Sequence, residues 1–500
     1  MTMVLDGRSR SQAHCCLRST TLLCMLALGG CVGAPVVRPP NIALPQAYDT
    51  DAPSRRAQQL DQWWLHYHDR QLSTLIDNAL GGGFSTRQAL ARLEEARAIR
   101  SSARARLGPQ GDLAASSEIR RTRYLSNGNL DLPGLPAGTS LTNLFAPATN
   151  KTASFDVSVG WEIDLLGRRR ANRSVAEADL AASEFSYEGA KSALVADVAR
   201  SLFEARGLAA QLDDAVASVT IQRNLSRLVG IRARRGIGAA GDNDRADADL
   251  ADLEAKAIDI RGALDASKRA LLVLAGRGSE VASSLEITGD PVPVPATPDT
   301  LPGDLLVRRP DVREAASRMQ SATGSVRVAE LAFYPTITPQ ATLGYASQTG
   351  GLGTTTLFGA LGSALSMPIF DRARLKAELR GAGARAEQSV LAYERSVQTA
   401  WSEADQAMIR LAADRSRMTV LAGGSTKAKA AYDAARLRYD HGLTDLDALL
   451  DAERAYRTSR MSETASRTDA LLRSVQLFQA LGGGWNPSDP PNPAKVRSPS

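Results

Sequence analysis

Two groups of aspartates, each placed just after a glycine-containing turn, are the residues with the clearest chemical potential. The first group follows a turn expected at Gly238 and Gly241, and the second follows a turn expected at Gly442. In chain order the acids are Asp242, Asp244, Asp247, Asp445, Asp447 and Asp451. Carboxylates gathered in this way attract cations. Acids at a helix start also simply cap the helix, so the sequence leaves both interpretations open.

Three other patterns resemble known sites but lack their requirements. Residues 236–241 match Gly-x-Gly-x-x-Gly, but they follow a long helical stretch instead of a strand. Asp242-x-Asp244 opens like a calcium loop, but Leu253 stands where the twelfth position requires glutamate. His66 and His68 would lie on opposite faces of the helix expected there, which argues against a shared metal. We also find no nucleophile–base pair, so the sequence predicts no enzyme, cofactor or metal.

Both aspartate groups belong to one repeated pattern. Residues 232–254 and 436–458 correspond at a constant offset of 204 residues, which indicates a duplicated unit. The matching landmarks are Arg234-Arg235-x-x-Gly238 with Asp247-Ala248-Asp249, and Arg438-Tyr439-x-x-Gly442 with Asp451-Ala452-Glu453.

Each copy lies inside a long stretch without proline. These stretches, 168–290 and 369–486, are rich in Ala, Leu, Arg, Glu and Asp, which predicts almost uninterrupted helix. A helix over 168–234 would be roughly 100 Å long, more than a compact domain can hold. We therefore expect two projecting helical hairpins, and a further helix over 56–80.

Strand signals lie outside these stretches. Over residues 155–165, apolar side chains such as Phe155 and Val157 alternate with polar ones such as Asp156. A second strand is expected near 336–345, with weaker partners at 113–124 and 357–367. Four strands in two hairpins suit either an outer-membrane barrel or an ordinary half-buried sheet, and periodicity alone does not decide.

The N-terminus resembles a bacterial export signal over residues 1–30. Leu28-Gly29-Gly30-Cys31 is similar to a lipoprotein cleavage site, which implies S-diacylglycerol and N-palmitoyl groups on Cys31. The alternative is a transmembrane anchor, but the apolar run is too short to cross about 30 Å of hydrocarbon. The other cysteines are Cys15, Cys16 and Cys24, so a processed chain could form no internal disulfide.

Composition excludes some classes of protein. The chain has 60 basic and 54 acidic residues, and they are interleaved along the helices, which argues against nucleic-acid binding. Aromatic residues make up only 5%, while small side chains are plentiful. This favours closely packed helices, as in a coiled-coil tube, over a wide globular core.

Several landmarks, in order, resemble the outer-membrane efflux (TolC-like) family, specifically its NodT-type lipoprotein branch, over nearly all of residues 31–485. Ala373 and residues 82–84 depart from the usual pattern and affect local turns only. The landmarks are Trp63-Trp64 with Asp69 and Leu72; residues 161–165 with Gly167-Arg168; residues 308–313; Tyr334-Pro335; residues 368–371; Arg438-Tyr439 with Gly442; and residues 480–485.

The resemblance implies a mainly α fold with a small β part. Each chain of a homotrimer would contribute four strands to a twelve-stranded outer-membrane β-barrel, which continues as a long α-helical coiled-coil barrel into the periplasm. The expected function is passive export of small molecules such as drugs, toxic compounds or metals. The expected partners are a periplasmic adaptor protein, an inner-membrane transporter of the resistance-nodulation-division (RND) class and outer-membrane lipid, with no nucleic acid.

The resemblance also assigns roles at the hairpin tips. Asp451 matches an acidic ring at the periplasmic entrance, Leu446 an apolar constriction beside it, and Asp244 another entrance acid. Asp447 and Asp242 would contribute to the same gate. The turns and the partner-docking surface would comprise Gly238, Gly442, Arg438 and Tyr439.

Two other functions remain open at this point: a duct for type I protein secretion, and a lipid-anchored coiled-coil protein without a pore.

The expected organisation follows from these elements. The segments are 1–30, signal peptide; 31–108, N-terminal segment and helices of the waist and upper tube; 109–166, first β-hairpin; 167–290, first helical hairpin with its tip near 235–247; 291–309, proline-rich loop; 310–333, helix; 334–369, second β-hairpin; 370–485, second helical hairpin with its tip near 440–451; and 486–500, flexible tail.

Overall fold

The structure is a computed structural model that describes residues 36–45, 48, 60–122, 148–236, 240–298, 302–349 and 353–486. Cys31, the expected signal and residues 487–500 lie outside the described residues. The chain divides into two compact units, considered separately below. One unit includes residues 98–177 and 320–387, and the other includes 38–97, 178–319 and 388–500.

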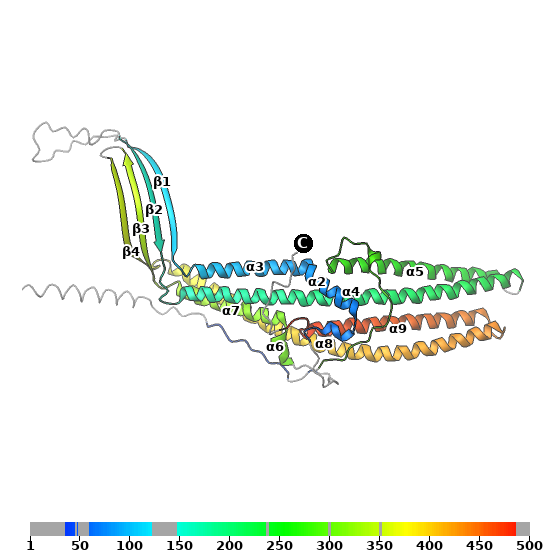
Figure 1. Ribbon diagram of the computed structural model, residues 1–500. Helices are drawn as coiled ribbons and strands as arrows, with labels where there is room; N and C mark the ends of the chain where they lie inside the picture. Colours follow the sequence, from blue (N-terminus) through cyan, green and yellow to red (C-terminus); the bar gives the residue numbers. More distant parts are fainter. Residues whose placement is uncertain are drawn as a thin grey trace, which may run out of the picture. The chain divides into compact units, whose positions relative to one another are not determined.

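The first unit contains a four-stranded antiparallel sheet (Figure 1). Neighbouring strands pair in the order β1-β2-β3-β4, so the prediction of four strands in two hairpins is confirmed. β1 and β4 each pair with only one strand of this sheet, which leaves one edge of each without a ladder partner. The strands are β1 (Gln110–Thr122), β2 (Ala148–Gly160), β3 (Thr336–Thr349) and β4 (Thr354–Ser366).

One face of the sheet is apolar and exposed in the single chain. The ladder aligns Phe155 with Tyr345, and Tyr345 with Leu357, so large apolar side chains form rows across the strands. Leu357 is 76% exposed and Leu361 is 90% exposed. The opposite face is mostly polar, as in the Ser116–Ser154 hydrogen bond of 2.8 Å. An apolar outside and a polar inside are typical of membrane strands.

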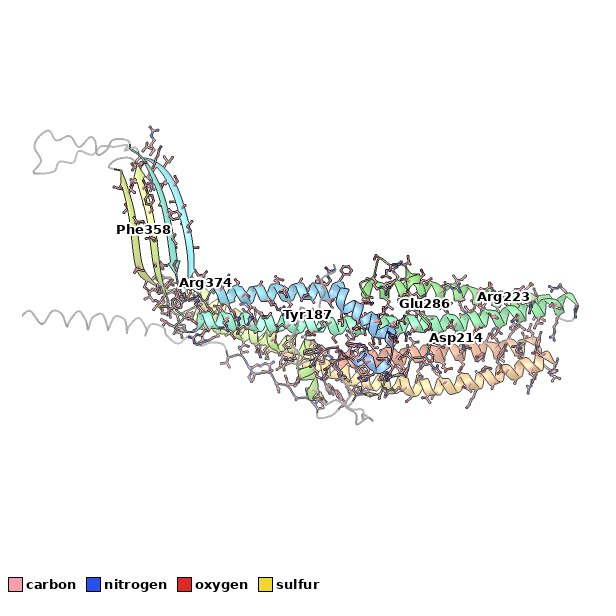
Figure 2. The ribbon with its side chains drawn as sticks, in the orientation of Figure 1. Tyr187, Asp214, Arg223, Glu286, Phe358 and Arg374 are labelled. Atoms are coloured by element: carbon pink, nitrogen blue, oxygen red, sulfur yellow. The ribbon has the colours of Figure 1, made fainter. Side chains whose placement is uncertain are left out.

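Phe358 is the large exception on the polar face (Figure 2). Its ring covers Gly344 on the neighbouring strand, where an added Cβ would lie 2.3 Å from the ring. Glycine at this position therefore makes room for an aromatic side chain on an otherwise polar surface.

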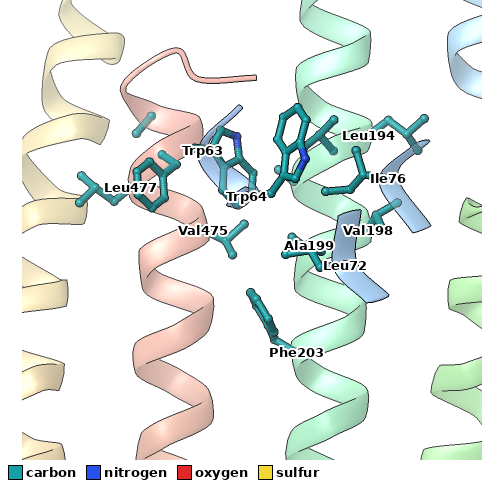
Figure 3. Close-up of a cluster of buried hydrophobic side chains, with 14 of the residues drawn as sticks. Trp63, Trp64, Leu72, Ile76, Leu194, Val198, Ala199, Phe203, Val475 and Leu477 are labelled. Atoms are coloured by element: carbon teal, nitrogen blue, oxygen red, sulfur yellow. The ribbon is translucent and has the colours of Figure 1, made fainter. Parts of the chain in front are cut away.

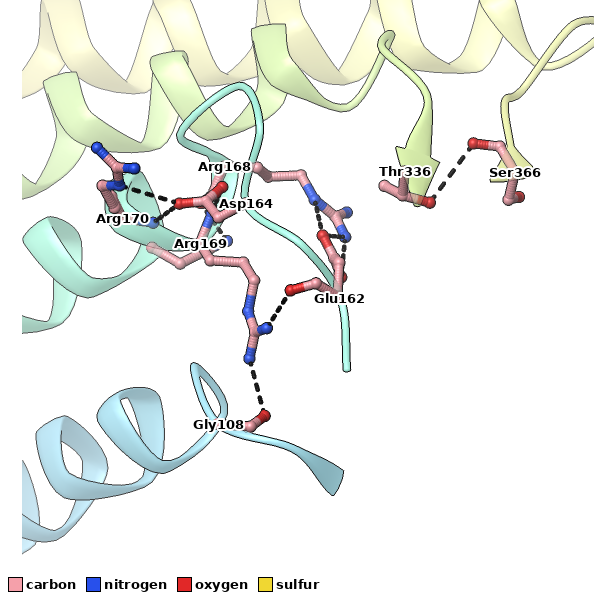
Figure 4. Close-up of polar contacts among 9 residues, drawn as sticks. Gly108, Glu162, Asp164, Arg168, Arg169, Arg170, Thr336 and Ser366 are labelled. Atoms are coloured by element: carbon pink, nitrogen blue, oxygen red, sulfur yellow. Dashed lines mark hydrogen bonds and ion pairs between the residues drawn. The ribbon is translucent and has the colours of Figure 1, made fainter. Parts of the chain in front are cut away.

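The strand expected over 155–165 is shorter than predicted at its C-terminal end. β2 ends at Gly160, opposite Gln110, which is the first paired residue of β1. Ile163 retains only an isolated bridge to Ile337. Asp164 then accepts hydrogen bonds from the backbone N–H groups of Arg169 and Arg170, both 3.1 Å, and so caps the next helix (Figure 4).

The four longest helices of the described residues form two hairpins. The first hairpin is α4 (Arg168–Arg234) with α5 (Ala240–Leu274), and the second is α8 (Arg372–Asp440) with α9 (Leu446–Ala480). Within each pair the helices lie side by side (Figure 1). α4 has 67 residues and α8 has 69, while α5 and α9 both have 35, as expected of a duplicated unit.

Within the described residues, no helix has both the length and the apolar character needed to cross a membrane.

The first hairpin is shorter than the proline-free stretch suggested. α5 ends at Leu274, and the helix does not continue to residue 290. Gly276 stops it with a φ of +74°, at a position where a Cβ would lie 3.0 Å from the backbone of Gly82. Only a short 3₁₀ turn, Ala282–Ser284, follows before residue 290. The chain there was expected to be helical because it lacks proline, but close packing against another backbone ends the helix.

The helix expected over 56–80 is divided in its described part. A 3₁₀ helix, η1 (Trp63–Tyr67), ends at His68, whose φ is +52°. Asp69 then caps α2 (Arg70–Gly82) by accepting a 3.0 Å hydrogen bond from the backbone N–H of Leu72. His66 and His68 therefore do not share one helix.

The second unit has an aromatic core at this division (Figure 3). The rings of Trp63 and Phe478 stack with centroids 5.3 Å apart, and Tyr67 packs against Phe203 at 4.9 Å. The Tyr67 hydroxyl bonds Ser474 at 2.6 Å. These contacts hold together three elements that are far apart in the chain: η1, α4 and α9.

Shorter elements complete both units. They are α3 (Phe84–Ala105), η4 (Pro302–Asp304), α6 (Leu305–Arg308) and α7 (Pro310–Leu331). Pro310 stands at the first position of α7, where its missing N–H has no helical partner to lose. After α9, Gly482 has a φ of +73° and lies against the backbone of Arg308, whose carbonyl also accepts a 2.8 Å bond from the Trp485 indole.

We expect Gly482→Ala to lower the free energy of unfolding by roughly 2–4 kcal/mol, because its φ is positive and a Cβ would lie 2.7 Å from the Arg308 carbonyl oxygen. Gly423→Ala is the matched control, since Gly423 is helical with no atom within 4 Å, and it should raise stability by up to about 1 kcal/mol. Denaturant unfolding followed by circular dichroism in detergent measures both. Equal effects would contradict this account.

Candidate functional site

The second hairpin turns through a glycine in the left-handed region. Gly442 has a φ of +71°, and its N–H donates to the Tyr439 carbonyl at 3.0 Å. The N–H of Leu443 donates to the Arg438 carbonyl at 2.8 Å. This pair of bonds is the Schellman arrangement, which satisfies the last carbonyls of α8 and permits a short turn.

The first hairpin begins its turn at Gly236, with a φ of +73° and a 3.0 Å bond from its N–H to the Ala233 carbonyl. Gly238, the predicted turn residue, lies outside the described residues. Gly241 lies within α5, so its assignment to the turn was wrong. A glycine pattern alone cannot say which glycine has the positive φ.

The acids of the second tip have different structural roles. Asp445 caps α9 by accepting a 3.0 Å bond from the Ala448 N–H, as the capping interpretation predicts. Asp447 lies two residues further, in the first turn of α9, and pairs with Arg245 of α5 at 2.7 Å, with both side chains more than half exposed. Asp447 therefore ties the two hairpins together at their tips.

Asp451 belongs to a second connection between the hairpins. Its side chain is 75% exposed and lies 3.8 Å from Arg454. Arg454 in turn pairs with Asp249 of α5 at 2.7 Å. Asp451 therefore presents a largely free carboxylate beside an arginine that already joins α9 to α5.

The three acids of the first tip lie on α5, where their side chains are exposed or half-buried. Asp244 is exposed on α5, Asp242 is partly buried in its first turn, and neither forms an ion pair with a described residue. Asp247 accepts hydrogen bonds from Ser226 of α4 and, at 3.0 Å, from Asn243. The structure places all three on the returning helix, as predicted, without bringing them to the Asp451 carboxylate through any described contact.

An apolar tip cluster supports these charges from below. It comprises Leu225, Val229, Tyr432, Tyr439, Leu449 and Leu450, with Leu446 partly buried against it. Tyr439 is only 6% exposed, and the Arg232 guanidinium lies 4.4 Å from its ring centroid. Tyr439 thus stabilises the tip from inside, whereas Arg438 is exposed. Burial of Tyr439 in the single chain does not favour its predicted docking role.

Beyond the tip cluster, further from the turns, lie charged residues that the sequence did not indicate as site residues. The Glu453 side chain is 3% exposed and pairs with Arg457 at 3.3 Å. Burial raises the pKa of Glu453, with Asp249 of α5 acting in the same direction, while Arg457 and Arg454 lower it. Asp214 of α4 (Figure 2) pairs with Arg460 of α9 at 2.6 Å. Glu453 and Arg457 are four positions apart on α9, but Asp214 and Arg460 are more than 200 positions apart, so no local signal could have found the second pair.

No group of three His, Cys, Asp or Glu side chains in the described residues is arranged to hold a metal ion. What the geometry provides is electrostatic: exposed carboxylates at the end of a long helical assembly, held by a few solvent-accessible ion pairs.

The chain matches the family described as Outer membrane efflux protein over residues 75–277 and 301–483. The chain belongs to this family. It is accordingly an outer-membrane channel protein of the efflux class that extends into the periplasm, and it is not an enzyme. Membership decides against the lipid-anchored coiled-coil protein without a pore.

Individual efflux proteins are similar over most of their length. The chain is 29% identical over 449 residues to the toluene efflux pump outer membrane protein TtgF of Pseudomonas putida, covering 87% of this chain and 88% of the relative. It is 28% identical to the outer membrane protein OprJ of Pseudomonas aeruginosa, covering 93% and 96%.

Solved structures agree with the fold. The outer-membrane channel OprN superimposes with a TM-score of 0.77 at 27% identity, covering 91% of this chain and 100% of OprN. VceC from Vibrio cholerae gives 0.74 at 26% identity, covering 86% and 100%. The mainly helical fold with four strands is therefore that of known channels of this efflux family.

The raised pKa of Glu453 predicts a pH-dependent tip. Because the folded state binds this proton more tightly than the unfolded chain, the contribution to stability is full below about pH 4.3 and is lost as pH rises through the raised pKa. Amide hydrogen exchange in residues 440–460, corrected for intrinsic rates, should therefore accelerate as pH rises from about 4.3 through the raised pKa of Glu453. Glu453→Gln should remove most of this acceleration.

The control for Glu453→Gln is Asp451→Asn, because Asp451 is 75% exposed and should leave the pH dependence in place. If Glu453→Gln keeps the pH dependence of the unmodified protein, buried Glu453 is not its source.

Proposed function

We propose that this chain forms a homotrimeric duct that passively exports small molecules across the outer membrane. The four-stranded sheet carries the argument, because its exposed apolar face suits lipid while β1 and β4 have unpaired edges. Open strand edges are not tolerated in hydrocarbon, and four strands are too few to enclose a lumen. Three copies joined edge to edge would give a closed barrel of twelve strands.

The helical hairpins of three chains would then form the periplasmic tube, with the tips at its entrance. Three copies each of Asp447 and Asp451 would surround one axis and favour cations. Leu446 would narrow the same passage, and Asp242 and Asp244 would add charge from the first hairpin. The side chains of these four aspartates are more exposed than those of the tip cluster, which supports this assignment.

The energy for transport would come from partner proteins. We infer a periplasmic adaptor and an inner-membrane transporter of the RND class, with docking at the turns around Gly238, Gly442 and Arg438. Relatives described as a toluene efflux pump protein, a pyoverdine export protein and an antibiotic efflux pump protein support a small-molecule cargo. They favour this cargo over type I protein secretion.

Lipidation of Cys31 completes the proposal. Acyl chains on this cysteine would anchor each chain to the outer membrane with about 0.8 kcal/mol for each buried CH₂ group. The lipoprotein-type sequence at residues 28–31 supports this modification.

The function is tested by the oligomeric mass and single-channel conductance of the mature protein extracted in detergent. We expect a trimer with a small, cation-preferring current, because edge pairing closes the barrel and the tip ion pairs keep the entrance narrow. Denaturing mass spectrometry of the same sample reports whether Cys31 bears lipid. A folded, lipidated monomer without current would overturn the proposed duct.

The gate is tested with variants that separate the effect of the tip carboxylates from the effect of the ion pair between the hairpins. Asp447→Ala with Asp451→Ala should raise conductance and lower cation preference, since it removes both the carboxylates and the 2.7 Å tie to Arg245. Arg245→Ala breaks the same tie but keeps both carboxylates, so conductance should rise while cation preference persists.

The matched control for these variants is Asp433→Ala, which removes an exposed carboxylate paired with Lys429 at 2.7 Å within α8 alone. It should leave the current unchanged. An unaltered current in the double variant, measured in planar bilayers, would remove Asp447 and Asp451 from the gate.

A further inference from the structure

All four strands have one terminus at the same end of the sheet, and the helices of the first unit begin or end there. The ladder pairs Gln110 with Gly160 and Thr336 with Ser366, and both pairs are terminal. We call the chain around this end of the sheet the collar: residues 104–109, 161–177 and 369–380. If the apolar face lies in the membrane, as the proposed function requires, the collar lies at the periplasmic boundary of the lipid.

Two segments of the collar expose large apolar side chains. Leu165 is 65% exposed after β2, and Phe370 is 99% exposed after β4, each beside a second exposed apolar residue. Trp161 is 47% exposed, and its indole N–H is fixed by a 2.9 Å bond to the Leu107 carbonyl. Aromatic and apolar side chains that combine with a polar anchor are typical of the interface between lipid and water.

Basic residues outnumber acidic ones in the collar by ten to five. Each of the five carboxylates already lies beside an arginine, as in the 2.7 Å pair of Glu162 with Arg168 (Figure 4). The remaining pairs are Asp164–Arg170, Glu177–Arg173, Glu177–Arg104, Asp371–Arg374 and Glu378–Arg374. The collar therefore has a surplus of positive charge that its own acids do not neutralise.

The surplus includes well-exposed cations. Arg106 and Lys376 are exposed and form no ion pair with a described residue. The Arg170 side chain is 80% exposed and pairs with one acid, Asp164, at 3.4 Å. Arg169 donates to the backbone carbonyls of Glu162, at 2.6 Å, and Gly108, at 3.4 Å, so its charge faces no carboxylate there (Figure 4).

The backbone amides at the start of α4 do not provide the anion site, because Asp164 already accepts from the N–H groups of Arg169 and Arg170. An anion beside α4 must therefore be bound by side-chain cations. Guanidinium groups suit phosphate because they present several donors in one plane.

We propose that the collar binds the head groups of anionic phospholipids in the periplasmic leaflet of the outer membrane. The exposed apolar side chains enter the interface, and Arg106, Arg170 and Lys376 contact the phosphodiesters from the aqueous side. The ligand is thus a diacylglycerol phosphate with net negative charge, such as phosphatidylglycerol, in preference to a zwitterionic lipid. This inference rests on the proposed membrane position of the sheet.

The test reconstitutes the full, mature trimer in vesicles of phosphatidylglycerol and phosphatidylethanolamine at about one to four. The protein is extracted with mild detergent, and the retained lipids are quantified by mass spectrometry. We expect phosphatidylglycerol to be enriched severalfold over the vesicle composition, and the enrichment to fall at high salt. The variant Arg106→Gln, Arg170→Gln, Lys376→Gln should retain lipid at the vesicle ratio.

The control removes three cations near the other end of the same strands: Arg120→Gln, Arg121→Gln and Lys151→Gln. It should keep the enrichment. Enrichment that is absent in the unmodified trimer, retained in the collar variant or lost equally in the control would overturn the proposal. Trimer mass and conductance from the same samples separate this outcome from failure of the duct, since a conducting trimer without lipid preference would contradict only the collar.

Discussion

The constraint on which the rest of this structure depends is that a strand edge cannot remain unpaired in lipid. The described part of a single chain has four strands with an apolar face, and within it β1 and β4 lack a strand partner on one side. Each backbone group left unpaired in hydrocarbon costs several kcal/mol. Closing the sheet with other copies would remove this cost. In the proposed trimer every tip residue would appear three times around one axis, so a gate at the tips would follow from symmetry.

Much of this arrangement could be predicted from local patterns. Alternation around Phe155 indicated β2, and the proline-free stretches indicated α4 and α8, because strand and helix periods are properties of neighbouring residues. Strand and helix ends were less predictable. β2 ends at Gly160 where its partner begins, and α5 ends at Leu274 where Gly276 meets the backbone of Gly82. Both limits depend on contacts between distant segments.

The candidate site shows the same division. The pattern located the acids on the returning helices, and the capping role of Asp445 was one of the alternatives it offered. It did not identify Arg245 as the partner of Asp447, nor the buried Glu453, because each depends on packing between α5, α8 and α9. The family resemblance implied that Tyr439 belongs to a docking surface, but the ring is buried under Arg232. An aromatic residue beside a turn can serve either purpose, and only burial distinguishes them.

The two hairpins descend from one pattern, yet their charges at the tip have become complementary. The first hairpin provides Arg245 to Asp447 of the second, and the second provides Arg454 to Asp249 of the first. At the repeat offset Arg245 corresponds to Leu449 and Asp447 to Asn243, so this pair does not follow from the shared pattern. Exposed ion pairs contribute only about 0–1 kcal/mol each, so the two together hold the tips with little energy. In the proposed duct, a connection of this strength would keep an isolated channel narrow and would still yield to a partner whose binding prefers the separated hairpins by a few kcal/mol.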